Sequence, residues 1–96
     1  MIDRKRNLIK TLKALGQETR FEILELLDNL PLRVGEISES LNLNLTTISQ
    51  HLNILENSDL ILRVQEGREK FCFRTSKATR ILRFLEENAK RSQEKE

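Results

Sequence analysis

The spacing of hydrophobic residues along the chain predicts five helices. Apolar residues recur every three or four positions in each, as on one face of an α-helix. We expect these helices at residues 4–15, 17–29, 34–41, 45–57 and 77–91. Gly16 is a C-terminal stop for the first helix, and Pro31 ends the second because it disfavours helical geometry at the residue before it.

Alternation of period two predicts strands in the rest of the chain. Residues 60–66 and 69–75 alternate in this way and are joined through Gly67, which can adopt the positive φ of a hairpin tip. Leu32 and Arg33, just after the proline, are predicted to be extended and to form a short strand. The fold class is therefore α+β and mostly helical, in the order helix, helix, strand, helix, helix, hairpin, helix.

Turn chemistry joins the third and fourth predicted helices. Asn42 tolerates the left-handed conformation, and Asn44 can cap the helix that starts at Leu45. Ile48 and Leu52 are expected to point inward, which leaves an uncharged, hydrogen-bonding outer face. Two helices joined by three residues and followed by a basic hairpin form a winged helix-turn-helix.

The parts of a winged helix suit double-stranded DNA. The second helix of the pair fits the major groove, where hydroxyl and amide groups can reach base edges while cations elsewhere neutralise phosphates. On the helix we expect DNA contacts from Leu45, Thr46, Thr47, Ser49, Gln50 and Asn53. On the wing we expect phosphate contacts from Arg63, Arg68 and Lys70, with Arg68 able to enter a minor groove. Gln50 is the first candidate for base readout.

Length and composition limit the other classes of function. The 96 residues suit one domain, taken as residues 1–96. The 17 basic and 15 acidic residues nearly balance each other, which is typical of a globular protein. The apolar runs are too short to cross a bilayer, and Cys72 is the single cysteine, so we expect a cytoplasmic protein. The single histidine and the lack of a phosphate-binding or nucleophile motif argue against an enzyme, and we expect no cofactor.

Several segments resemble one family of bacterial regulators. The run Ala14-Leu15-Gly16-Gln17-Glu18-Thr19-Arg20-Phe21-Glu22-Ile23-Leu24 is similar to the opening of ArsR/SmtB-type repressors. The segments 35–41 and 45–55 are similar to the helix-turn-helix of that family, and 66–68 to its wing. The resemblance covers residues 8–75 and implies a homodimeric DNA-binding repressor.

The resemblance also implies how two chains would pair. The first and last helices, residues 4–15 and 77–91, would meet across a two-fold axis. Candidate dimerisation residues are Leu8, Ile9, Leu12, Ile81, Leu82 and Leu85. Such symmetry predicts a pseudo-palindromic operator with half-sites about 34 Å apart.

Metal ligands known from the family are missing at the matching positions. Arg33-Val34-Gly35 stands where metal sensors carry a pair of cysteines, and residues 77–96 contain neither His nor Asp. We therefore expect no metal site, and the inducing signal is undefined.

Alternatives to these interpretations remain open at this level. The two helices could form a hairpin in an unrelated small domain, or the winged helix could be a protein-interaction module that binds nucleic acid weakly. Cys72 could be a redox switch whose thiol pKa is lowered by Lys70 and Arg74, or a packed and inert thiol. His51 is expected to contact backbone or phosphate and not a metal, because one imidazole cannot fill a metal site.

Overall fold

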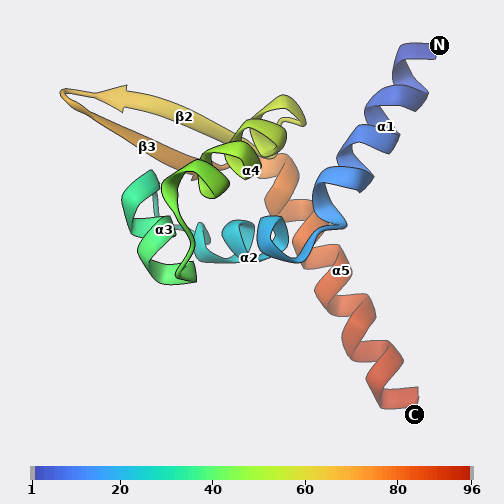
Figure 1. The fold of residues 1–96 in the computed structure, drawn as a ribbon. Helices are drawn as coiled ribbons and strands as arrows, with labels where there is room; N and C mark the ends of the chain where they lie inside the picture. Colours follow the sequence, from blue (N-terminus) through green and yellow to red (C-terminus); the bar gives the residue numbers. More distant parts are fainter. Residues whose placement is uncertain (1, 96) are drawn as a thin grey trace.

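The computed structural model describes the backbone of residues 2–95 and the side chains of residues 3–91. Its elements follow the predicted order. The helices are α1 (Ile2–Leu15), α2 (Glu18–Leu26), α3 (Val34–Leu41), α4 (Leu45–Asn57) and α5 (Ser76–Lys95), and the strands are β1 (Leu32–Arg33), β2 (Ile61–Glu66) and β3 (Glu69–Arg74). The β2–β3 hairpin projects to one side, while α1 and α5 diverge on the opposite side (Figure 1).

The core lies between α2, α3, α4 and the base of the hairpin. Its fully buried side chains come from all of these elements: Ile23, Leu24, Ile37, Ile48, Leu52, Leu55, Leu60 and Ile61. Ile48, Leu52 and Leu55 form the inward stripe of α4, as the sequence predicted. Truncating one such side chain, as in Leu52→Ala, costs about 2–5 kcal/mol.

The turn before α4 follows the predicted asparagine chemistry. Asn42 has φ 54° and ψ 46°, the left-handed conformation that ends α3. The side chain of Asn44 accepts a hydrogen bond from the backbone N–H of Thr47 at 2.8 Å and so caps α4. The hydroxyl of Ser38 donates to the carbonyl of Leu43 and closes the turn from the other side.

Three helices have bounds that differ from the prediction. α1 begins at Ile2 and α5 continues to Lys95, so both terminal helices are longer than expected. α2 ends at Leu26, before the predicted limit, and Asn29 adopts a positive φ of 60° ahead of Pro31. Asparagine tolerates that conformation, so the chain turns before the proline is reached.

The sheet has the order β1-β3-β2, and both pairings are antiparallel. Leu62 lies opposite Phe73, and Val64 lies opposite Phe71, on the outer face of the sheet. The inner face carries Ile61 and Cys72, which are fully buried. Leu62 and Val64 are exposed, so the hairpin packs on the helices through one face alone.

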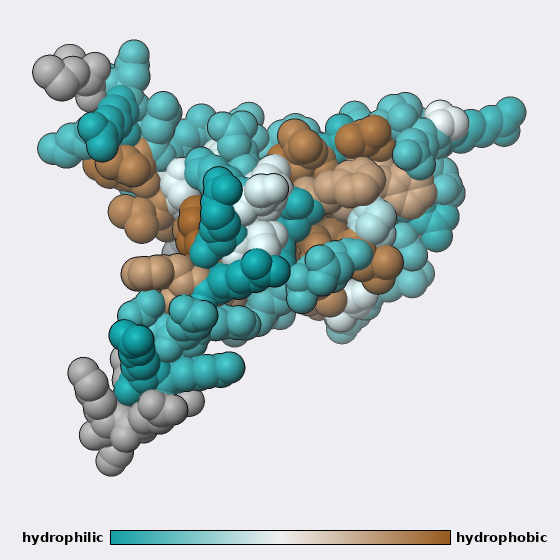
Figure 2. Space-filling view, turned by 180° about the vertical axis from the view of Figure 1, so that it is seen from behind, coloured by the Kyte–Doolittle hydropathy of each residue, from teal (hydrophilic) through white to brown (hydrophobic). Residues whose placement is uncertain are grey.

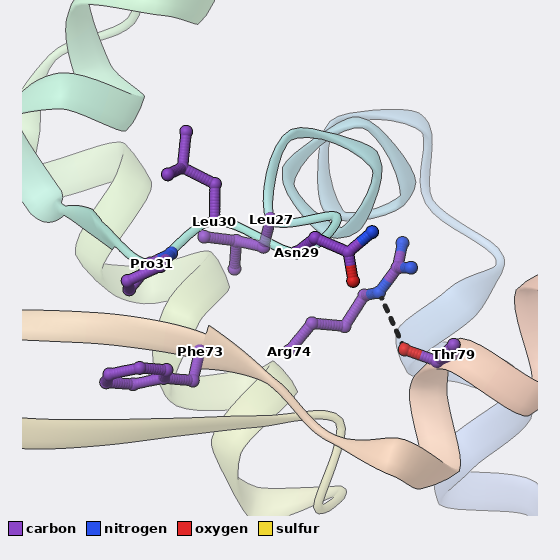
Figure 3. A pocket seen from close by; sticks show the side chains of 7 residues that line it. All are labelled: Leu27, Asn29, Leu30, Pro31, Phe73, Arg74 and Thr79. Atoms are coloured by element: carbon purple, nitrogen blue, oxygen red, sulfur yellow. Dashed lines mark hydrogen bonds between the residues drawn. The ribbon is translucent and has the colours of Figure 1, made fainter.

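Arg74 joins the sheet to two helices. Its guanidinium donates to the carbonyl of Leu24 at 3.0 Å, to Asp28 at 2.7 Å and to the hydroxyl of Thr79 at 3.0 Å. Figure 3 shows this side chain extending from β3 towards Thr79 on α5, beside a small cleft of about 300 Å³ under Pro31. All three guanidinium nitrogens are engaged, so this arginine positions α2 and α5 on the sheet.

No helix within the described residues is both long enough and apolar enough to span a membrane.

Candidate nucleic-acid interface

The outer face of α4 carries uncharged polar side chains. Leu45, Thr46, Gln50 and Asn53 are exposed, whereas Thr47 and Ser49 are half-buried. No lysine or arginine occurs between residues 45 and 57. This face can therefore offer hydrogen bonds and apolar contacts to base edges, but it has no lysine or arginine to attract phosphate.

Cations for phosphate lie on the hairpin instead. Gly67 has φ +61° at the tip, as predicted, and the adjacent Arg68 and Lys70 are exposed. Neither of these two cations forms an ion pair with any of the residues that the structure describes. Glu69 is engaged elsewhere, because Arg33 donates to it at 2.6 Å. Arg68 and Lys70 are thus free to meet phosphate beside α4.

Arg63, the third cation predicted to contact phosphate, is engaged within the protein. Its Nη2 donates to the Oδ1 of Asn53 at 2.6 Å and to Glu56 at 2.7 Å. The arginine side chain is only 17% exposed, and the hydrogen bond with Arg63 lowers the pKa of the Glu56 carboxyl. Asn53 and Arg63 are predicted as separate DNA contacts, but the structure joins them to each other, and this attaches the hairpin to α4.

Arg20 contacts both α1 and α4, a role that no local pattern in the sequence predicts. Arg20 donates to the last carbonyls of α1, from Nε to Ala14 at 2.8 Å and from Nη2 to Lys13 at 3.0 Å. Its Nη1 lies 3.3 Å from the Nδ1 of His51 on α4. Burial, and then the charge of Arg20, lower the pKa of His51. His51 therefore faces the protein and not the outer face of α4.

Cys72 is fully buried in the core. Burial raises the pKa of its thiol and outweighs the charges of Arg63 and Lys70, which lower it, so of the two alternatives the structure favours the packed thiol. Lys70 is exposed to solvent, which screens its charge, and Arg74 is paired with Asp28. A buried, protonated thiol is a packing group and a poor nucleophile.

No group of three or more His, Cys, Asp or Glu residues in the described part of the chain could hold a metal ion.

A second surface lies between the terminal helices. Apolar side chains line the notch between α1 and α5 on the left of Figure 2. A groove of about 760 Å³ there is lined by apolar residues, Leu8, Leu12, Leu15 and Ile81, and by Lys77 among its polar ones. The exposed apolar side chains of this surface are Leu8, Ile9, Leu12, Phe84 and Leu85.

One predicted dimerisation residue lies elsewhere. Leu82 is 5% exposed and packs in the chain's own core, so it has little surface to offer a partner. Phe84 instead is 65% exposed on α5, three positions after the groove residue Ile81. Helical spacing assigned Leu82 to the dimer surface because core and surface apolar residues lie only two or three positions apart on α5.

The fold is a winged helix-turn-helix, because it combines a helix-turn-helix with a three-stranded sheet and a projecting hairpin. This confirms the predicted fold class. The family model of arsR-type bacterial regulatory proteins matches residues 17–62. The helix-turn-helix of this chain is therefore similar to that of the ArsR family, and this confirms the predicted resemblance.

Similar proteins include two named regulators. The transcriptional repressor SdpR of Bacillus subtilis is 38% identical over 56 residues, which are 58% of this chain and 62% of SdpR. The transcriptional activator HlyU of Vibrio cholerae is 38% identical over 60 residues, 62% of this chain and 56% of HlyU. The matched segment thus spans about three fifths of each relative.

Solved structures extend the likeness to the whole fold. The structure of HlyU from Vibrio cholerae has a TM-score of 0.77 at 29% identity, covering 88% of this chain and 94% of that one. A winged helix-turn-helix domain from Mycobacterium bovis, described as homodimeric and as a possible ArsR-family regulator, has a TM-score of 0.91 at 24% identity. It covers 99% of this chain and 89% of that domain.

Proposed function

We propose that this chain is a sequence-specific DNA-binding transcriptional regulator that acts as a homodimeric repressor in the cytoplasm, with no catalytic role. The observation that carries the proposal is the exposed, uncharged outer face of α4 beside the unpaired wing cations Arg68 and Lys70. The first surface suits base edges, and the second suits phosphates. The named regulators SdpR and HlyU support the same class of function.

The dimer is proposed from the apolar surface of the terminal helices. Leu8 and Leu12 on α1 are 58% and 67% exposed, and Phe84 projects from α5. Apolar side chains concentrated on one side of a small domain favour association, and a two-fold contact buries the same surface on both chains. The homodimeric Mycobacterium bovis domain, which shares the fold, supports this arrangement.

Two-fold symmetry sets the expected operator. A dimer would present two α4 helices to successive major grooves on one side of the duplex, about 34 Å apart. The operator should therefore be a pseudo-palindrome. Repression is the proposed sense of regulation, as named for SdpR, and a promoter–reporter assay distinguishes it from the activation named for HlyU.

A fluorescence-anisotropy titration tests the DNA-binding proposal. The full chain is titrated into the duplex upstream of its own gene and into a shuffled duplex of equal composition, at two salt concentrations. We expect tighter binding to the upstream duplex, weakening with salt because the wing releases counterions from phosphates. Absence of binding to either duplex at low salt would overturn the proposal.

A second candidate function is a winged-helix protein-interaction module. The observation that favours it is the outer face of the sheet, where Leu62 and Val64 are exposed beside Phe71 and Phe73. The absence of lysine and arginine from α4 also reduces its attraction for DNA. Leu62→Glu separates the two functions, because it would abolish protein capture through the sheet while leaving DNA affinity unchanged.

A further inference from the structure

The contact between Arg63 and Asn53 determines which way the Asn53 amide is turned. Arg63 Nη2 lies 2.6 Å from the Asn53 side chain. A guanidinium has only N–H donors, so the atom that it contacts must be the amide oxygen and not the amide nitrogen. The orientation of this asparagine is therefore set by chemistry, and its Oδ1 is directed towards the hairpin.

Glu56 holds Arg63 in this position. The same Nη2 donates to Glu56 at 2.7 Å, so the two N–H groups of that nitrogen serve one acceptor each. The hydrogen bond with Glu56 raises the pKa of Arg63, and the arginine is charged at every working pH. Charge-assisted hydrogen bonds of this kind are short and strong, which restrains the rotation of the Asn53 amide.

The consequence appears on the outer face of α4. Asn53 is exposed there, on the helical stripe that also carries Thr46 and Gln50. A free asparagine reads adenine by donating to N7 and accepting from N6 at once. Because Arg63 occupies one lone pair of Oδ1 and draws this oxygen towards the hairpin, the NH₂ group, a hydrogen-bond donor, is the part of the Asn53 amide directed away from the hairpin.

We propose that Arg63 is a positioning residue that holds Asn53 as a hydrogen-bond donor, so that α4 selects guanine over adenine at the base facing Asn53. Guanine offers two acceptors in the major groove, O6 and N7, whereas adenine pairs one acceptor with a donor. This inference rests on the proposed function, since it assigns a base preference to the same DNA-binding helix.

Binding selection from an operator library tests the inference. Each base pair of the preferred upstream duplex is randomised in turn, and relative affinities are measured for the wild type, Asn53→Ala and Arg63→Met. The position where Asn53→Ala removes base preference identifies the base that Asn53 faces. We expect the wild type to prefer guanine to adenine there by about tenfold. Arg63→Met, which keeps the aliphatic stem but frees the amide, should move the preference to adenine.

Controls separate orientation from stability and from charge. Glu56→Gln retains Arg63 beside Asn53, and we expect it to keep the guanine preference. If Arg63→Met does not fold, Arg63→Met combined with Glu56→Met leaves no unpaired charge and should show the same shift to adenine.

The possible outcomes distinguish this inference from the proposed function. A wild type without base preference at any position would overturn the proposed function. A wild type that is selective elsewhere, but prefers adenine at the Asn53 position, would overturn the inference alone. Equal loss of affinity on all sequences in Arg63→Met would also overturn it, because that is the signature of a lost phosphate contact.

Discussion

Arg20 and His51 are 31 positions apart in the sequence, and their side chains meet at 3.3 Å. Arg20 can only donate, so the Nδ1 of His51 must be its acceptor and the imidazole must be neutral. Since Arg20 also holds the last carbonyls of α1, this contact places α4, the proposed DNA-contacting helix, relative to a proposed dimerisation helix.

Stability should fall when His51 is protonated. Its pKa in the folded chain is lowered from 6.5, so the unfolded chain binds the proton more readily. The free energy of unfolding is then highest above pH 6.5 and decreases as the pH falls from there through the lowered pKa. Urea unfolding of the wild type between pH 7 and pH 5 measures this decrease.

The matched control for that experiment is His51→Gln, which keeps an acceptor but does not titrate. Glu36 and Glu56 also have lowered pKa values, yet carboxyls of this kind respond mainly below pH 4.5. We therefore expect a flatter profile for His51→Gln between pH 7 and pH 5. An unchanged slope in the variant would show that another group is responsible.

The cap of α4 should contribute measurably to stability. Replacing Asn44 by Ala removes the acceptor for the Thr47 N–H, and we expect a loss of about 1 kcal/mol in the free energy of unfolding. Asn57→Ala, at the exposed C-terminal end of the same helix, should cost less than about 0.5 kcal/mol. Equal losses in both variants would contradict the capping role.

Local signals in the sequence predicted the helix-turn-helix closely, but they did not predict the long-range contacts. α3 and α4 have the predicted bounds because Asn42 and Asn44 act on their immediate neighbours. The partners of Arg63 and Arg20 depend on how distant elements pack, which no spacing of residues reports. The sequence also does not show which face of β2 is buried, because apolar residues occur on both faces of this strand.

Dimer formation should depend on the exposed leucines of α1. Leu12 is 67% exposed beside the groove between α1 and α5, so Leu12→Glu would place a charge in the proposed interface without disturbing the core. We expect sedimentation equilibrium to give a dimer for the wild type and a folded monomer for the variant. Leu62→Glu on the sheet should remain dimeric, and a dimeric Leu12→Glu would exclude this surface as the interface.

Gln50 and Arg68 should differ in what their removal does to DNA binding. Gln50→Ala should cost about 1–3 kcal/mol at one base pair and leave affinity for random DNA intact. Arg68→Ala should weaken binding to every duplex and reduce the salt slope by about one. Anisotropy titrations of both variants over a range of salt concentrations measure this difference. An equal loss of affinity on all sequences in Gln50→Ala would show that Gln50 does not read a base.

In the proposed function, α4 and the wing together form the DNA surface. Amide NMR of the ¹⁵N-labelled chain, titrated with its upstream duplex, tests this claim residue by residue. We predict the largest shift changes at residues 44–50 and 67–70, with little change on the outer face of the sheet at Leu62 and Val64. Changes concentrated at Leu62 and Val64, or none at residues 44–50, would contradict the account.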